Sequence, residues 1–209
     1  YQLGSAYSPK ALNGMFMTYI GTNPETLDYS RDKIKREIDK GTYYKVKKGL
    51  YEDNLNVNGY LLAGIIESLS YISFEYALSK YGLIPERVVN YTCATTLKKH
   101  NRHVKNIFGE YFYTDVPIDV WSLGVKYIVE DEYSYLIATK EKALCDLLYK
   151  KPPVNSIKGL KELLFEDLRI DKDMFNELNF EDITSVCDLY KKKNLKLLKK
   201  MLEKGNVNE

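Results

Sequence analysis

The sequence predicts an α+β protein built in two parts, and three observations support this. A short basic segment with helical spacing is followed at once by an alternating, hairpin-like segment. Beyond residue 60 come several short segments rich in Val, Ile, Tyr and Phe, and then a helical C-terminal stretch. Short strands without helices between them favour antiparallel or mixed pairing. We therefore expect a small N-terminal domain over residues 1–55. Residues 56–209 are expected to form a larger domain with a mixed or antiparallel sheet and C-terminal helices.

Composition limits the class of protein before any motif is considered. Hydrophobic residues make up 44% and charged residues 29% of the 209 positions, and the formal net charge is only +2. This balance belongs to a folded chain with a core and excludes a disordered one. No apolar run approaches the roughly 20 residues that span a bilayer, so we expect no membrane partner.

The cysteines predict the compartment. Cys93, Cys145 and Cys187 lie far apart in apolar contexts. An odd number at these spacings indicates reduced, buried thiols in a cytoplasmic protein. The chain does not begin with Met, and the native start could be as late as Met15 or Met17.

Residues 28–41, DYSRDKIKREIDKG, are predicted to form a short helix. Ser30, or the aspartate two positions earlier, is suited to cap its start, and Gly41 to end it. Ile34 and Ile38 lie four positions apart and share one face, while Arg36 points almost opposite them. The helix therefore has a narrow apolar stripe and a charged, mostly basic outer face.

Residues 42–51, TYYKVKKGLY, are predicted to form a hairpin. Tyr44 and Val46 alternate with lysines, so they fall on one face of a strand. Lys48 and Gly49 suit a tight turn, after which Leu50 begins a return strand.

A short basic helix followed at once by a basic hairpin is the order of a winged helix-turn-helix. Such a helix fits the DNA major groove, and the hairpin can contact the neighbouring phosphates. An ordinary solvated helix and hairpin is the alternative reading of the same charges. The residues that we expect to bind DNA are Ser30, Arg31, Lys33, Lys35 and Arg36 from the helix, and Tyr43, Lys45, Lys47 and Lys48 from the hairpin.

The larger domain is predicted from its apolar segments. Residues 60–69 are expected to be helical, and Ser73 is expected to cap a second helix that ends at Gly82. Strands are expected over residues 88–94, 104–108, 111–116, 125–129 and 133–138. Thr139 is expected to cap a helix that runs to Lys150, and residues 156–203 are expected to form three or four more helices.

Other constellations give weaker signals. The C-terminal helix, YKKKNLKLLKKMLEK, is basic and amphipathic, which favours a docked terminal helix over a second DNA contact, a partner helix or a membrane-surface helix. His100 and His103 lack the further ligands that zinc needs. Glu141 and Asp146 flank an apolar stripe without an acid–base geometry that the sequence can support. We therefore predict no catalytic residues, no metal, no cofactor and no enzyme activity.

Three stretches together resemble one family. They are IKREIDKGTYYKVKKGLYE, YISFEYALSKYGLIPERVVNYTCATT and YLIATKEKALCDLLY. The first resembles the recognition helix and wing of a regulator. The second and third resemble the core signatures of AbiEi-family proteins, the antitoxins of abortive-infection toxin–antitoxin systems. The resemblance covers about residues 33–149, and its segments occur in the expected order.

The resemblance implies a fold and a function. The fold would be an N-terminal winged helix-turn-helix with a C-terminal α+β domain. The protein would be a bacterial autorepressor that binds inverted repeats in its own promoter and takes part in phage defence. Its functional partner would be a co-encoded nucleotidyltransferase toxin, with which a stable complex is not required. The C-terminal domain would carry the antitoxin effect.

Two other functions are kept as alternatives. In the first, the winged motif is vestigial and the chain is a protein-interaction module that binds a partner through its C-terminal domain. In the second, the C-terminal domain is an enzyme, which a deep pocket with convergent polar groups would support.

Overall fold

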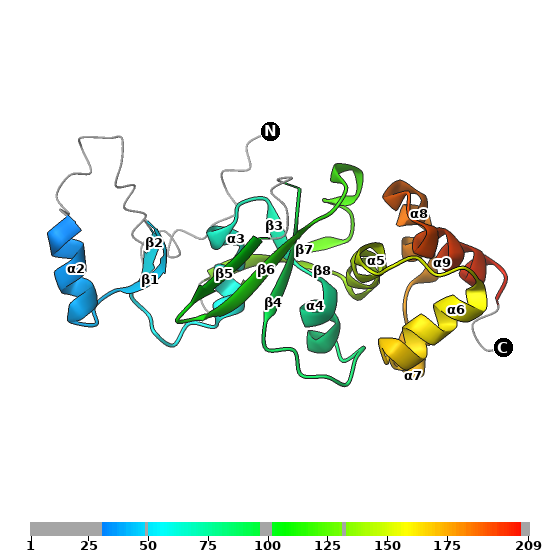
Figure 1. Ribbon diagram of the computed structural model, residues 1–209, viewed down its shortest axis with the longest axis horizontal. Coiled ribbons are helices and arrows are strands. Elements are labelled where there is room, and N and C mark those ends of the chain that lie inside the picture. The colour runs from blue at the N-terminus through cyan, green and yellow to red at the C-terminus, as the bar shows by residue number, and fades with distance from the viewer. Residues whose placement is uncertain (1–30, 49, 97–101, 131–132, 206–209) are drawn as a thin grey trace.

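The computed structural model describes residues 31–48, 50–96, 102–130 and 133–205, without the side chains of residues 31–33. Its described elements follow one another along the long axis of the molecule (Figure 1). Helix α2 (Arg31–Asp39) and a hairpin lie at one end, a six-stranded sheet lies in the middle, and the C-terminal helices lie at the other end. The fold belongs to the α+β class, as the sequence predicts.

The predicted basic helix and hairpin are both present. Helix α2 ends in a Schellman motif: the N–H of Gly41 donates to the carbonyl of Ile38, and that of Thr42 donates to the carbonyl of Glu37. Gly41 has φ of 75°, a conformation that favours glycine, which confirms its predicted role. Strands β1 (Tyr44–Lys47) and β2 (Leu50–Glu52) then pair antiparallel. The rest of the predicted winged helix-turn-helix would lie in residues 1–30, which are outside the described residues.

The sheet is mixed. Its strand order is β5-β6-β4-β3-β8-β7, with parallel pairing in β4–β6 and β3–β8 and antiparallel pairing elsewhere. The strands are β3 (Ser70–Ile72), β4 (Tyr91–Thr95), β5 (Arg102–Asn106), β6 (Gly109–Asp115), β7 (Val125–Glu130) and β8 (Tyr133–Ala138). The five predicted strands are all present, with ends shifted by up to three residues, and β3 is an additional strand.

Strand β3 lies near the middle of the sheet, and the sequence prediction missed it. The predicted helix over residues 60–69 is instead a 3-10 helix, η2 (Gly59–Leu62), followed by one turn of α-helix, α3 (Ala63–Ile66). Leu69 then adopts a left-handed φ of 57°, and β3 begins at the next residue. All three residues of β3 are buried, so the strand has no alternation of apolar and polar side chains to reveal it.

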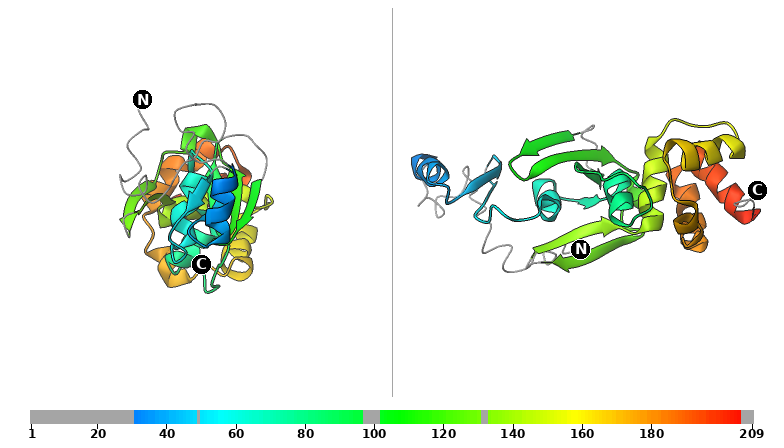
Figure 2. Two further views of the ribbon diagram at one scale, coloured as in Figure 1. Left: turned by 90° about the vertical axis from the view of Figure 1, so that its left-hand side faces the viewer. Right: turned by 90° about the horizontal axis from the view of Figure 1, so that it is seen from below.

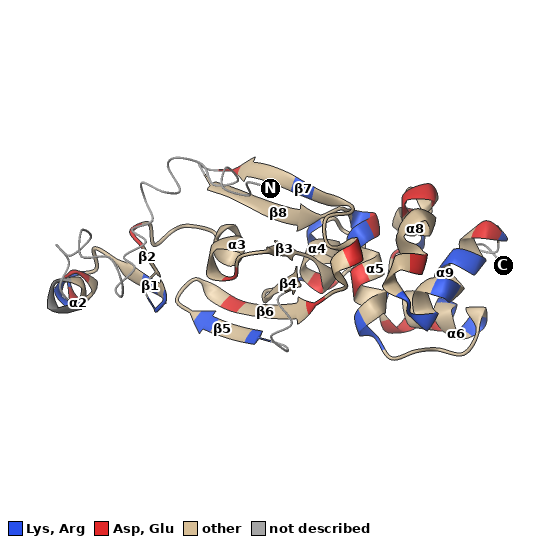
Figure 3. Ribbon diagram, turned by 90° about the horizontal axis from the view of Figure 1, so that it is seen from above, with Lys and Arg blue, Asp and Glu red and all other residues tan. Residues whose placement is uncertain are grey.

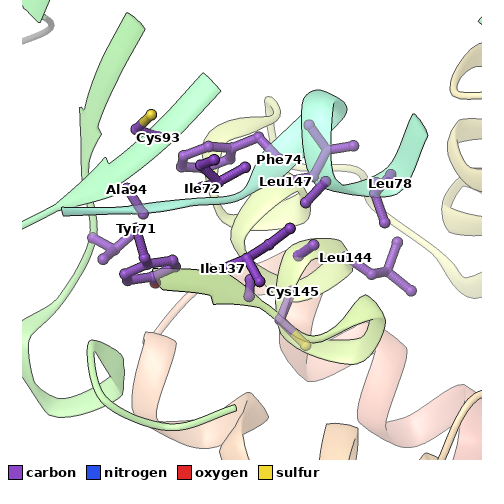
Figure 4. Close-up of a cluster of buried hydrophobic side chains, with 14 of the residues drawn as sticks. Tyr71, Ile72, Phe74, Leu78, Cys93, Ala94, Ile137, Leu144, Cys145 and Leu147 are labelled. Carbon is purple, nitrogen blue, oxygen red and sulfur yellow. The ribbon is translucent and has the colours of Figure 1, made fainter. Parts of the chain in front are cut away.

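Helices α4 (Phe74–Lys80) and α5 (Lys140–Lys150) pack together against the sheet. Figure 4 shows how Phe74, Leu144 and Leu147 meet the strand residues Ile72 and Ile137 in the core. Thr139 caps α5 by accepting from the N–H of Lys142, as predicted. Ser73 stands at the N-cap position of α4 but makes no capping hydrogen bond, so its predicted role is wrong.

The C-terminal part is helical, as predicted, with a short helix η3 (Ile118–Val120) preceding it in the sheet domain. Its described helices are α6 (Ile157–Glu162), the π-helical turn η4 (Leu163–Asp167), α7 (Lys172–Asn176), α8 (Phe180–Cys187), η5 (Asp188–Tyr190) and α9 (Lys193–Glu203). Helix α9 buries Leu195, Leu198, Met201 and Leu202, while Lys196 and Lys200 stay exposed. It is therefore a docked terminal helix. None of the described helices has both the length and the apolar character needed to cross a membrane.

Candidate nucleic-acid interface

Helix α2 presents its basic face to solvent. Ile34 is only 5% exposed and Ile38 is half-buried, whereas Lys35 and Arg36 are exposed. The apolar stripe thus faces inward and the predicted recognition face points outward. Arg31 and Lys33 lie on the same helix, but their side chains fall outside the described residues, as does Ser30.

The hairpin turns Val46 inward and Lys45 outward. Val46 is 2% exposed and joins the core of the large domain, while Lys45 and Lys48 are exposed and Tyr43 is half-buried. The pattern of β1 confirms the predicted alternation. The hairpin therefore offers two accessible lysines on the side away from its packed face.

Strand β1 is fixed to the sheet domain by polar and aromatic contacts. The amide Nδ2 of Asn106, at the end of β5, donates to the carbonyl of Val46 over 3.0 Å. The ring of Tyr44 meets that of Phe108 edge-on, with centroids 6.4 Å apart and an interplanar angle of 87°. These contacts cross the predicted boundary at residue 55, so the hairpin is seated on the sheet domain.

Lys47 takes part in this attachment. Its ammonium donates to the backbone carbonyl of Ile66 in α3 over 2.5 Å, and the side chain is half-buried. Lys47 therefore differs from Lys45 and Lys48, the exposed lysines of the hairpin. The bond from its ammonium helps to hold the hairpin on the sheet domain.

Glu52, the last residue of β2, fixes this strand to the sheet domain. This fully buried carboxylate accepts from the N–H groups of Asp53 and Asn54 and from the hydroxyl of Tyr133 in β8, at 3.0–3.1 Å. All three bonds go to Oε1, and Oε2 has no hydrogen-bond partner among the described residues. Desolvation by burial raises the pKa of Glu52 above its ordinary 4.5.

Helix α2 carries acids among its cations, namely Asp32, Glu37 and Asp39. Lys40 pairs with Glu37 at 3.0 Å, one turn away on α2. For Lys35, Arg36, Lys45 and Lys48 no ion pair is formed within the described part of the chain. Figure 3 shows the basic residues of α2 and β1 at this end of the molecule. Such a surface suits the polyanionic backbone of a nucleic acid.

The basic surface does not continue along β5. His103 and Lys105 are exposed on this neighbouring strand, but both pair with Glu110 of β6. The bond from Lys105 lowers the pKa of the Glu110 carboxyl. Arg102 of the same strand pairs with Glu67. The described residues contain no group of His, Cys, Asp and Glu suited to a metal, and His100 lies outside them.

A buried polar network lies at the opposite side of the sheet domain, and the sequence prediction missed it. Asp146 of α5 is fully buried and accepts four hydrogen bonds. Tyr71 and Ser73 donate to Oδ2 over 2.9 and 2.7 Å, and Lys142 and Tyr190 donate to Oδ1 over 2.9 and 2.6 Å. The network joins β3, the start of α4, helix α5 and η5. Only Lys142 and Asp146, four positions apart on α5, are linked by local spacing, because the other members lie far away in the sequence.

The chemistry of this network is structural. Burial lowers the pKa of Lys142, although the bond to Asp146 acts in the opposite direction. Burial, and then the Asp146 charge, raises the pKa of Tyr71 and of Tyr190. The hydrogen bonds to Asp146 tie four elements of the fold together. Lys142 and Asp146 belong to the stretch ATKEKALCDLL, so this part of the family resemblance falls on a core network.

No protein-family model matches the chain, and a comparison with curated proteins found no match. The α+β class is therefore established by the structure alone. The resemblance to the AbiEi family rests on the three sequence stretches alone.

Proposed function

We propose that the chain is a DNA-binding transcriptional autorepressor that also serves as an antitoxin against a co-encoded nucleotidyltransferase toxin. The observation that carries DNA binding is the placement of the basic side chains. Lys35 and Arg36 on α2, and Lys45 and Lys48 on the hairpin, are exposed at one end of the molecule. A helix and a hairpin of this kind can occupy a major groove and its flanking phosphates.

Each element has a separate role in this proposal. Arg36 stands opposite the buried stripe of α2, where its guanidinium can reach base edges and read sequence. Lys45 and Lys48 are exposed on the hairpin and suit phosphate contacts, which fix orientation without reading sequence. The anchoring of Val46 and Glu52 to the sheet domain holds the hairpin rigidly, which reduces the entropy lost on binding.

The antitoxin part of the proposal is supported by the resemblance of two stretches, in residues 71–96 and 135–149. They contribute β3, β4, α4 and α5, the centre of the sheet domain. We assign the antitoxin effect to that domain, with no stable complex with the toxin required.

The alternative function, a protein-interaction module with a vestigial winged helix, is favoured by one observation. Lys47, a predicted phosphate contact, is engaged with Ile66 inside the protein. In that case the hairpin would serve the fold, and the chain would bind a partner protein through its C-terminal domain.

The proposed function is tested in cells with a reporter gene placed behind the chain's own upstream promoter. The wild type is expected to lower expression, and Arg36→Ala to relieve that repression. Lys40→Ala is the matched control, since Lys40 lies on the same helix but is paired with Glu37. Repression that is absent in all three contradicts autorepression, and repression that is equal in all three contradicts the role of Arg36 in it. In a parallel experiment, co-expression with the neighbouring toxin gene is expected to restore growth, and unrestored growth contradicts the antitoxin role.

A further inference from the structure

The sheet ends in two edge strands, β5 and β7. An edge strand carries unpaired backbone N–H and C=O groups on its outer side, which another chain can use for pairing. Within the described residues nothing pairs with the outer side of β7, a strand of six residues, VKYIVE. Figure 2 shows β7 and β8 along one border of the sheet. Tyr127 and Val129 are 48% and 62% exposed on this strand.

The opposite edge, β5, lacks charges that would be complementary in a pair of two copies. Its sequence is RHVKN, and His103 and Lys105 are both exposed. In antiparallel pairing with a second copy centred on Val104, His103 would face Lys105 of the partner subunit. The strand carries no acidic side chain that could attract that lysine.

Strand β7 has the reverse property, because its charges are complementary to themselves. When two copies pair antiparallel about Ile128, Lys126 lies directly opposite Glu130 of the partner subunit. The symmetry of the pair repeats this contact at its other end. Tyr127 lies opposite Val129 of the partner subunit on the other face, so each apolar side chain also meets an apolar one.

The side chains of β7 are held in suitable places for this pairing. Lys126 is exposed. Glu130 is half-buried on the same face, two pleats along, and its carboxylate accepts from the hydroxyls of Tyr60 and Tyr135. A carboxylate with two oxygens keeps lone pairs for a further donor. A lone lysine on an edge strand discourages pairing, but here Glu130 provides the opposite charge in register.

We infer that the outer edge of β7 is a homodimerisation surface, which pairs antiparallel with the same strand of a second copy about a two-fold axis at Ile128. The two sheets would then form one continuous sheet. A two-fold dimer would also relate two copies of α2 as an inverted repeat in DNA requires. That last consequence rests on the proposed function, whereas the dimer itself does not.

Sedimentation velocity without DNA tests the surface, from low micromolar to several hundred micromolar protein. The wild type is expected to show a reversible monomer–dimer equilibrium. Lys126→Glu or Glu130→Lys alone is expected to weaken it about tenfold, because both symmetric attractions become repulsions. An equimolar mixture of the two variants is expected to dimerise as the wild type does, since every cross-strand pair is again opposite in charge. A wild type that stays monomeric, or a mixture no tighter than either variant, overturns the inference.

A cysteine placed on the symmetry axis tests the register and does not depend on the Glu130 variant folding. Ile128→Cys is expected to form a disulfide-linked dimer on mild oxidation with oxidised glutathione, because the two sulfurs would face each other. Lys126→Cys is the control, because its two copies would lie four positions out of register and beyond disulfide reach. The native Cys93, Cys145 and Cys187 are buried. Equal cross-linking of both variants, or of neither, contradicts the proposed register.

Discussion

The ammonium of Lys142 lies 2.9 Å from the carboxylate of Asp146, one turn further along α5, and both side chains are almost completely buried. Such a pair loses hydration on folding and is stable only when its remaining bonds are satisfied. Here Tyr71, Ser73 and Tyr190 supply them from three other elements. The pair therefore fixes where β3, α4 and the C-terminal helices meet.

Removal of the Asp146 charge is expected to destabilise the fold strongly. Asp146→Asn leaves the Lys142 ammonium buried without a counter-charge, which costs about 3–5 kcal/mol. Urea unfolding measures the loss. Lys142→Met combined with Asp146→Asn is expected to cost clearly less than the sum of the two single changes, because the second change removes the unpaired charge. Additive losses would show that the two groups are not coupled.

The buried Glu52 predicts a specific dependence of stability on pH. Burial raises its pKa above 4.5 in the folded state, so the folded protein holds this proton more tightly than the unfolded chain. The stability that this tighter proton binding gives the folded protein is complete below the pKa of Glu52 in the unfolded chain. It is lost as the pH rises through the raised pKa of Glu52 in the folded protein. Glu52→Gln, which keeps the shape without the charge, is expected to remove this loss. The stability difference between variant and wild type should therefore grow with pH across this window and then level off.

Urea midpoints measured from about pH 4 to about pH 8 test this expectation. Asp119→Asn serves as the control, because Asp119 is exposed and is not among the groups that shift the pKa of Glu52. Parallel curves for Glu52→Gln and the wild type would show that Glu52 titrates normally in the folded protein.

Lys45 and Lys47 are expected to separate binding from stability, although they are two positions apart. Lys45→Ala should weaken binding to specific and random DNA alike and lower the salt slope by about 1, as expected for a phosphate contact. Lys47→Ala should mainly lower the free energy of unfolding, because it removes the bond to the Ile66 carbonyl. Binding isotherms at several salt concentrations and urea unfolding of both variants measure the two effects. A reversed pattern would mean that Lys47 leaves Ile66 to reach DNA.

The elements with a periodic pattern could be predicted from the sequence. The hairpin, the strands β5 to β8 and the capped helix α5 all carry local signals, such as alternation or a Thr at the N-cap. Strand β3 carries none, because it is three residues long and buried on both faces. Strands β4 and β8 pair with it on either side, and neither follows it directly in the sequence.

The candidate site was predictable only in part, for a similar reason. The exposed faces of α2 and β1 follow from helical and strand periodicity, and the structure confirms them for Lys35, Arg36 and Lys45. The different role of Lys47 depends on Ile66, which comes near only when α3 folds beneath the hairpin. The Asp146 network likewise depends on tertiary packing, which no spacing in the sequence reports.

The proposed reading of DNA sequence by α2 is tested most directly by Arg36→Ala. Fluorescence anisotropy is measured with the chain's own promoter duplex and with a scrambled duplex, at two salt concentrations. Tight, salt-sensitive binding that prefers the promoter is expected for the wild type and for Lys40→Ala. Arg36→Ala is expected to lose about 1–3 kcal/mol on the promoter and much less on the scrambled duplex. Equal losses on both duplexes, or a wild type that does not distinguish them, would contradict sequence reading by this helix.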